Sequence, residues 1–147
     1  MDFGLDEEVK AEEKKKEILS LEEKKKRQPF AYWNVGGESF RMKLNTATIC
    51  KLEDKFKCNL MDVLSRYGNI PPLSVMLAIT QGAMLPWKHG LKYEQVQGLF
   101  DKYCEEGGTQ LTFLTDVLIP IYQVSGFFSD GQQESMEKKL EEVKDLM

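Results

Sequence analysis

The sequence predicts a mainly α-helical protein of the α+β class, in which a two-stranded β-hairpin near the amino terminus packs on a bundle of about five helices. The hairpin is indicated by Gly36-Gly37, which separates two runs of alternating apolar residues. The helices are indicated by apolar residues at spacings of three and four further along the chain. A shift in composition then divides the chain into a charged helical extension (residues 1–28), a single globular domain (29–129) and an amphipathic carboxy-terminal helix (130–147).

The hairpin prediction depends on its turn, because two adjacent glycines tolerate the positive φ that a two-residue hairpin turn requires. This turn pairs Val35 with Glu38 and, by the same register, Trp33 with Phe40. One face is then almost wholly apolar and needs helices to cover it. The apolar face comprises Ala31, Trp33, Val35, Phe40, Met42 and Leu44, and the opposite face comprises Tyr32, Asn34, Ser39, Arg41 and Lys43.

Five helices are predicted after the hairpin, each with a residue that suits a helix start or stops a helix. The fifth is the most hydrophobic and is expected at the centre of the bundle, with a kink at Pro120. In the third helix, Gly82 permits close packing or a bend. The expected starts are Asn45 or Thr46, Asn59, Pro72, Lys92 and Thr109, and the expected stops include Gly68, Pro86 and the pair Gly107-Gly108.

The two charged extensions leave alternatives open. Residues 5–27 are rich in helix formers, but their apolar residues form no continuous stripe, so a solvated helix and an oligomer-forming arm are both open. Nucleic-acid binding is disfavoured there because acidic residues balance the basic ones. Residues 134–147 form an amphipathic pattern of two heptads, which is too short to hold alone. This helix therefore docks on the body, pairs with a neighbouring chain or melts; its apolar residues are Met136, Leu140, Val143 and Met147.

The cellular location and the thiols are predicted from what the sequence lacks. No apolar run approaches the roughly 18 residues of a membrane span, and the amino terminus has no export-signal pattern, so we expect a cytosolic protein without a membrane partner.

The three cysteines are odd in number and form no Cys-X-X-Cys motif. We therefore expect Cys50, Cys58 and Cys104 to be free thiols buried in helices.

Catalytic chemistry is not indicated. His89 is the single histidine of the 147 residues and falls in a predicted loop, without a nucleophile, phosphate-binding or zinc-binding motif around it. The carboxylates Asp62, Asp101 and Asp116 fall on separate helices. We therefore expect no catalytic residue, no cofactor and no metal site, and a hydrolase that uses His89 with a cysteine is the least favoured alternative.

Two apolar groups are candidates for contact with a partner. One lies at the corner after the third helix, and the other lies at the end of the globular domain, where only one of two adjacent phenylalanines is expected to enter the core. The alternative is that all of these side chains complete the core. The candidate partner-binding residues are Met84, Leu85, Trp87, Val124, Phe127 and Phe128.

Over residues 30–128 the chain resembles the short tail assembly chaperones of long-tailed bacteriophages and prophages of Gram-positive bacteria. The resemblance comes from the order of packing and turn residues along the chain, and none of them is a catalytic signature. The segments that carry it are YWNVGGESFRMKLNTATICKLEDKF, NLMDVLS, IPPLSVMLAITQGAMLPWKHGL, VQGLFDKYCEEGG and LIPIYQVSGFF.

The resemblance implies a non-enzymatic protein that binds the phage tape-measure protein and keeps it soluble before the tail tube polymerises. Such a protein is displaced by tail tube subunits, works in the host cytosol and is absent from the mature virion. It also implies a longer form of the same chain, made by a ribosomal frameshift. Whether the chain forms a homo-oligomer is left open. The competing interpretations are a structural component of the phage tail or head and a small regulatory protein-binding module.

Overall fold

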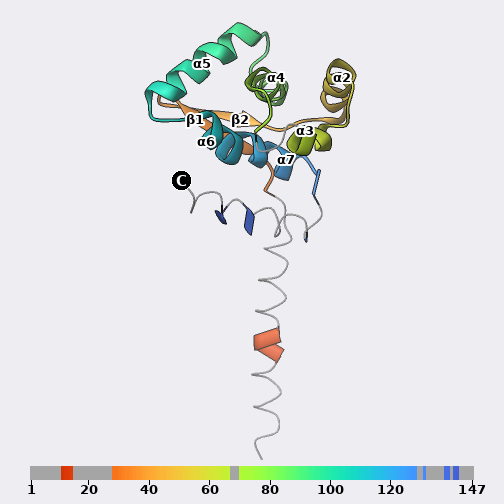
Figure 1. Cartoon of the computed structure of the whole chain (residues 1–147). Helices are drawn as coiled ribbons and strands as arrows, with labels where there is room; N and C mark the ends of the chain where they lie inside the picture. Colours follow the sequence, from red (N-terminus) through yellow and green to blue (C-terminus); the bar gives the residue numbers. More distant parts are fainter. Residues whose placement is uncertain are drawn as a thin grey trace, which may run out of the picture.

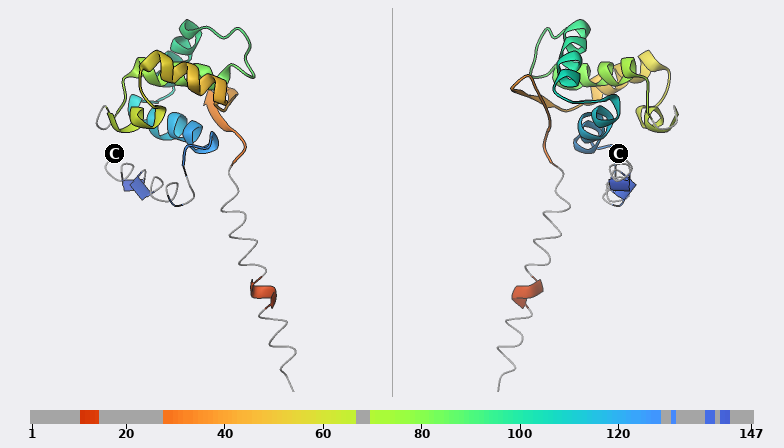
Figure 2. Two further views of the ribbon diagram at one scale, coloured as in Figure 1. Left: turned by 90° about the vertical axis from the view of Figure 1, so that its right-hand side faces the viewer. Right: turned by 60° about the vertical axis from the view of Figure 1, so that its left-hand side comes forward.

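The elements follow one another along the chain as predicted, with a hairpin first and helices after it. The computed structural model describes residues 11–14, 28–66, 70–128, 131, 138–139 and 141–142. Helices α2, α4 and α5 lie above the hairpin in Figure 1, whereas α3, α6 and α7 lie beside or below it, and both views of Figure 2 agree. The elements are β1 (Ala31–Val35), β2 (Glu38–Met42), α2 (Thr46–Phe56), α3 (Leu60–Arg66), α4 (Leu73–Met84), α5 (Tyr93–Glu105), α6 (Gln110–Phe113), the π-helical segment η1 (Leu114–Leu118) and α7 (Ile119–Val124).

The hairpin has the predicted turn and register. Gly36 and Gly37 both have positive φ, of 62° and 76°, and Trp33 lies opposite Phe40. The backbone N–H of Gly36 donates to the Glu106 carboxylate at 2.7 Å, which ties the turn to the end of α5. All six residues of the predicted apolar face are buried. The α+β prediction is therefore confirmed, and the hairpin contributes one whole face to the core.

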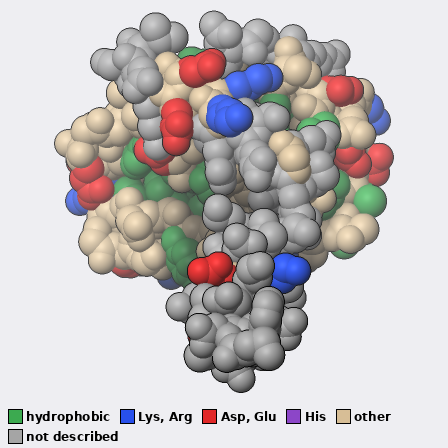
Figure 3. Space-filling model, turned by 90° about the horizontal axis from the view of Figure 1, so that it is seen from below, with side chains coloured by type: hydrophobic (Ala, Val, Ile, Leu, Met, Phe, Trp, Pro, Cys, Tyr) green, Lys and Arg blue, Asp and Glu red, His purple; other side chains and the backbone are tan. Residues whose placement is uncertain are grey.

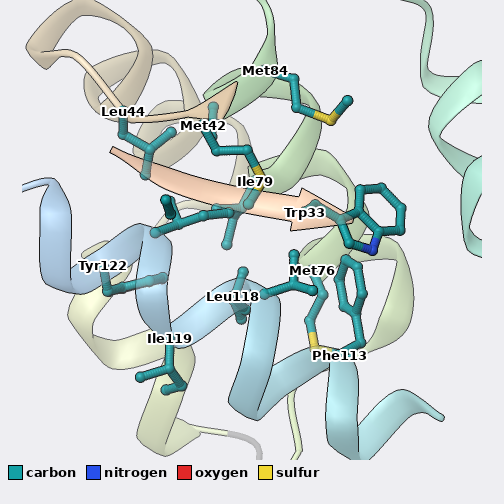
Figure 4. Packing of buried hydrophobic residues seen from close by; sticks show 14 of the residues in the cluster. Trp33, Met42, Leu44, Met76, Ile79, Met84, Phe113, Leu118, Ile119 and Tyr122 are labelled. Carbon is teal, nitrogen blue, oxygen red and sulfur yellow. The ribbon is translucent and has the colours of Figure 1, made fainter. Parts of the chain in front are cut away.

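Aromatic rings join the sheet to the helices at one end of this core. The Trp33 ring lies 5.2 Å from Phe113 and 6.0 Å from Tyr103, both in edge-on contacts, and Phe100 lies 5.3 Å from Phe113. Figure 4 shows Trp33 and Phe113 side by side, with Met76 of α4 next to them. Edge-on pairs of this kind add to the stabilisation that comes from burying the rings. This cluster fixes the hairpin against α5 and α6.

Side-chain caps set the predicted helix starts. Asn45 accepts the backbone N–H of Thr48 at 2.8 Å, and Asn59 accepts that of Met61 at 2.9 Å. At α6, Thr109 accepts the N–H of Thr112 at 3.1 Å. Each cap satisfies a backbone donor that the first turn of a helix leaves without a partner. The starts of these helices were therefore readable from the sequence.

The fifth predicted helix is divided into α6, η1 and α7, and its π-helical segment directly precedes the turn that contains Pro120. The backbone N–H of Ile119 donates to the Leu114 carbonyl, five residues earlier, which is the bond of a π-helix. A proline lacks the N–H for an α-helical bond, and its ring collides with the carbonyl four residues before it. The wider π-helical turn accommodates Pro120 instead. As predicted, this segment is central to the core, and most of its side chains are buried.

Tyr122 anchors α7 to α3 with the only polar atom of its buried side chain. Its hydroxyl donates to the Leu60 carbonyl at 2.7 Å, and its ring is fully buried. Burial raises the pKa of Tyr122 well above its ordinary value, with smaller contributions from the nearby Cys58 and Glu53. Burial also raises the pKa of Tyr103.

Replacing Tyr122 with phenylalanine is expected to lower the free energy of unfolding by about 1 kcal/mol, because one buried hydrogen bond is lost. It is also expected to weaken the dependence of stability on alkaline pH. A tyrosine whose pKa is raised by folding keeps its proton while the unfolded chain loses one, so its contribution is complete below the unfolded pKa of about 10 and falls as the pH rises above it. Urea unfolding between neutral and alkaline pH measures both effects. Equal pH profiles for the two proteins would contradict the assignment to Tyr122.

The extensions lie largely outside the described residues. Residues 11–14 are helical, as are 131, 138–139 and 141–142. The four apolar residues of the predicted carboxy-terminal stripe lie outside the described residues, as do Tyr67 and Gly68 at the predicted end of the second helix. The predictions for these segments therefore stay predictions.

Candidate functional site

The residues considered for catalysis do not converge in the structure. His89 is exposed in the connection between α4 and α5, and Asp62, Asp101 and Asp116 are exposed on separate helical segments. Within the described parts of the chain, no group of three or more histidine, cysteine, aspartate or glutamate side chains could hold a metal ion. No helix among the described residues is long and apolar enough to cross a membrane.

The prediction of free thiols is confirmed, but the prediction that they are buried is wrong for two of the three cysteines. All three cysteines are free, as expected, but Cys50 and Cys104 are exposed and only Cys58 is partly buried. Cys50 follows Ile49 on α2, and Cys104 follows Tyr103 on α5; in both cases the preceding residue packs against the core. One helical step turns the next side chain by about 100°, which carries both thiols outward.

An aromatic and basic surface forms where the connection after α4 meets the outer face of the hairpin. We call it the aromatic–basic patch, and it consists of Phe30, Tyr32, Arg41, Lys43 and Trp87. Phe30 and Trp87 make an edge-on contact with ring centroids 5.2 Å apart. The Arg41 guanidinium lies 4.8 Å from the centre of the Phe30 ring and 5.7 Å from that of Trp87. The Lys43 ammonium lies 5.9 Å from the Phe30 ring.

The backbone holds Trp87 in place for these contacts. The Met84 carbonyl, at the end of α4, accepts the N–H groups of both Trp87 and Lys88 at 3.0 Å. The side-chain amide of Gln81 donates to the Leu91 carbonyl at 3.1 Å, which closes the connection against the same helix. These bonds fix the backbone at Trp87 and the contact with Phe30 positions its ring, so a partner that binds there removes less conformational freedom. Trp87 is therefore held at this surface by its backbone and by its neighbours.

The register of the hairpin supplies the rest of the patch. Tyr32 lies directly opposite Arg41 on the outer face, and Lys43 continues that face one step beyond the end of β2. Tyr32 is 48% exposed and Trp87 is 37% exposed, and these are the large hydrophobic side chains most open to solvent among the described residues. Exposed aromatic side chains beside arginine are typical of contact surfaces between proteins.

The first predicted contact group is divided by the structure. Trp87 is exposed and belongs to the patch, and Leu85 is partly exposed. Met84 is fully buried, which corrects its assignment as a contact residue. The reason is helix geometry, because Met84 lies on the face of α4 that also buries Met76 and Thr80. Met84 therefore belongs to the core.

The second predicted contact group lies mostly inside the core. Val124 and Phe128 are buried, so their assignment as contact residues is also corrected. Phe127 is partly buried, with its ring 4.7 Å from that of Tyr122, and keeps an exposed edge. As expected, only one of the two adjacent phenylalanines enters the core fully. Neither a hydrogen bond nor a ring contact joins this group to Trp87 among the described residues.

The described side chains on the underside of the molecule carry charges of both signs. In Figure 3, acidic and basic side chains are interspersed on that face, and hydrophobic side chains lie between them. This agrees with the sequence, in which residues 29–129 contain equal numbers of acidic and basic side chains.

Comparison with protein families gives one match. Residues 30–145 match the model of a family of unknown function, DUF6096. The chain belongs to this family. The searches of curated proteins and of solved structures found no match. The DUF6096 match begins at the first residue of the patch, Phe30, and extends over most of the predicted carboxy-terminal helix.

In this DUF6096 member, sequence reasoning found part of the patch and missed how it is assembled. The alternation of the hairpin placed Tyr32, Arg41 and Lys43 on its outer face, and Trp87 was considered separately. Phe30 was not singled out. The available signal was its spacing, since Phe30 lies two residues before Tyr32 and so extends the same face of the strand. Trp87 reaches this face of the hairpin through a tertiary contact, and no local sequence pattern indicates that contact.

Proposed function

We propose that this protein is a phage tail assembly chaperone, without enzymatic activity, that binds the tape-measure protein and keeps it soluble while the tail tube assembles. The observation that carries the proposal is the ordered, exposed Trp87 beside Phe30 and Arg41, a surface suited to binding a polypeptide. The identity of the partner comes from the resemblance over residues 30–128, which falls within the range of the family match.

The proposed role explains why a small exposed patch is sufficient. A tape-measure protein is very long, so many copies of a chaperone bind along one polymer and each needs only modest affinity. Weak individual contacts also dissociate fast enough for tube subunits to replace them. In this proposal the protein acts in the host cytosol and does not remain in the virion. Tail tube protein, a frameshifted longer form and a second copy of the chain are further proposed partners.

Co-expression with the adjacent tape-measure gene tests the proposal. We expect the soluble fraction of the tape-measure protein to rise when this chain is present and the gain to be lost with Trp87→Ala. His89→Ala, an exposed residue of the same connection, is the matched control and should retain the full gain, which would also exclude a role for His89 chemistry. A tape-measure protein that is equally soluble without this chain would remove the proposed role.

The competing structural role makes a different prediction about the particle. A component of the tail or head is present in purified virions in a fixed copy number, whereas an assembly chaperone is not. Quantitative mass spectrometry of purified particles separates the two. A stoichiometric amount of this chain would contradict the chaperone and support the structural component.

A further inference from the structure

Among the described residues, Arg41 contacts aromatic rings and pairs with no acidic side chain. Its guanidinium stacks within 6 Å of both Phe30 and Trp87, and these two rings brace each other edge-on. Arginine in this position is fixed by cation–π attraction while the N–H groups at its edge stay available as donors. The rings therefore orient a cation without using its hydrogen-bonding capacity.

The positive charge of the patch has no acidic partner in the described part of the chain. Within the described residues, neither Arg41 nor Lys43 forms an ion pair, although both are accessible. On the sheet, Glu38 lies at the opposite end of β2, three residues from Arg41, which is roughly 10 Å along an extended strand. The neighbouring Glu106 accepts the Gly36 N–H at that same distant end. The described part of the chain thus leaves both cations of the patch to a partner.

Flat apolar surfaces flank these cations. Tyr32 stands beside Arg41 across the hairpin, and Trp87 stands beside it from the connection after α4. Both rings are more than one third exposed. A partner that fits this arrangement carries a carboxylate for Arg41 and, next to it, an apolar side chain for the rings.

We propose that the aromatic–basic patch binds an acidic segment of another polypeptide, in which a glutamate or aspartate pairs with Arg41 and an adjacent apolar side chain packs on Trp87 and Tyr32. The inference rests on the proposed function in that the partner is a polypeptide, and it specifies the chemistry of the segment that is bound. Single-stranded nucleic acid is the other class that aromatic and basic surfaces bind. It is disfavoured because two cations neutralise few phosphates and the chain has a net charge of −4.

Fluorescence anisotropy with labelled synthetic peptides tests this inference on the purified full-length chain. The probes are a short peptide of leucine and glutamate and the same peptide with glutamine in place of glutamate. We expect the glutamate peptide to bind more tightly and to lose affinity as salt is raised, whereas the glutamine peptide should respond little to salt. Equal affinities for the two peptides, or tighter binding of an oligothymidine, would overturn the inference.

Substitutions locate the binding on the patch. Arg41→Gln is expected to weaken binding of the glutamate peptide by about five- to tenfold, between the effect of an exposed ion pair and that of a charge-assisted hydrogen bond. Arg41→Lys should lie in between, because it keeps the charge and loses the planar, stacked donor group. Lys55→Gln is the matched control, since the Lys55 ammonium also lies 5.9 Å from a phenylalanine ring, that of Phe56, but on α2. An equal loss with Lys55→Gln would place the binding outside the patch.

The peptide assay and the co-expression assay fail independently. If the tape-measure protein is made soluble but the glutamate peptide does not bind, the acidic-segment inference is wrong and the chaperone proposal stands. If the peptide binds at Arg41 but the tape-measure protein gains no solubility, the patch is a binding site for another acidic polypeptide and the chaperone proposal is wrong. Melting temperatures of the variants show whether either result reflects a loss of folding.

Discussion

Replacing Trp33 with alanine is expected to lower the free energy of unfolding by about 3–5 kcal/mol, which is a large part of the stability of a domain of this size. Trp33 is almost fully buried and has the largest side chain of the core. Its ring contacts Phe40, Tyr103 and Phe113, so its removal leaves a cavity bounded by three separate elements. These neighbours are held by other contacts and cannot close the space completely.

Chemical unfolding of Trp33→Ala and Tyr32→Ala measures this effect with a control one residue away. Tyr32 belongs to the same strand but faces solvent, so Tyr32→Ala should cost less than about 1 kcal/mol, mainly through its cross-strand contact with Arg41. Because both variants replace an aromatic residue of β1 with alanine, the comparison removes any general effect of that change on the strand. Similar losses for the two variants would contradict the assignment of Trp33, and not Tyr32, to the core.

Trp33→Phe separates the packing of the ring from its polar atom. The indole N–H of Trp33 is buried and has no hydrogen-bond partner among the described residues. Leaving such a donor without a partner costs free energy, and phenylalanine removes the donor while keeping an aromatic ring. We therefore expect Trp33→Phe to cost only a small fraction of the loss seen with Trp33→Ala. This variant also leaves Trp87 as the only tryptophan of the chain, so that its tryptophan fluorescence comes from the patch alone when a peptide is added.

The fold could be predicted because its main determinants are local. Gly36-Gly37 fixes the hairpin register, and the polar caps Asn45, Asn59 and Thr109 fix helix starts. Local rules did not indicate the π-helical segment that precedes Pro120. Proline is compatible with the first turn of α7 but not with an unbroken α-helix through that point, and a sequence pattern does not show which irregular turn the chain adopts before it.

The candidate surface could be predicted only in part because it is made by tertiary contacts. Hydrophobicity alone nominated Met84, Val124 and Phe128, and all three are buried. An apolar side chain near the end of a helix has the same sequence signal whether it completes the core or faces a partner. Arg41 and Trp87 are 46 positions apart in the sequence numbering, and their contact depends on the path of the connection after α4.

Replacing Gly82 with alanine is the second large change expected, with a loss of about 2 kcal/mol in the free energy of unfolding. A Cβ atom at this position would lie 2.8 Å from the Thr48 methyl group and 3.5 Å from Leu52, both on α2. The glycine therefore allows α4 to pack closely on α2. Alanine favours the helical conformation by up to about 1 kcal/mol, which offsets only part of the collision.

Two further variants distinguish this collision from a general effect of alanine. Gly98 lies in α5 with open space around the position of a Cβ, so Gly98→Ala should raise the free energy of unfolding by about 0.5–1 kcal/mol. Thr48→Ser keeps the hydroxyl and removes the methyl group with which the new Cβ of Gly82→Ala would collide. Because the remaining contacts of that Cβ, with Leu52 at 3.5 Å and Leu44 at 3.8 Å, are of ordinary length, Thr48→Ser should recover most of the loss when it is combined with Gly82→Ala. A double variant whose losses simply add would show that the cost does not arise from the collision with the Thr48 methyl group.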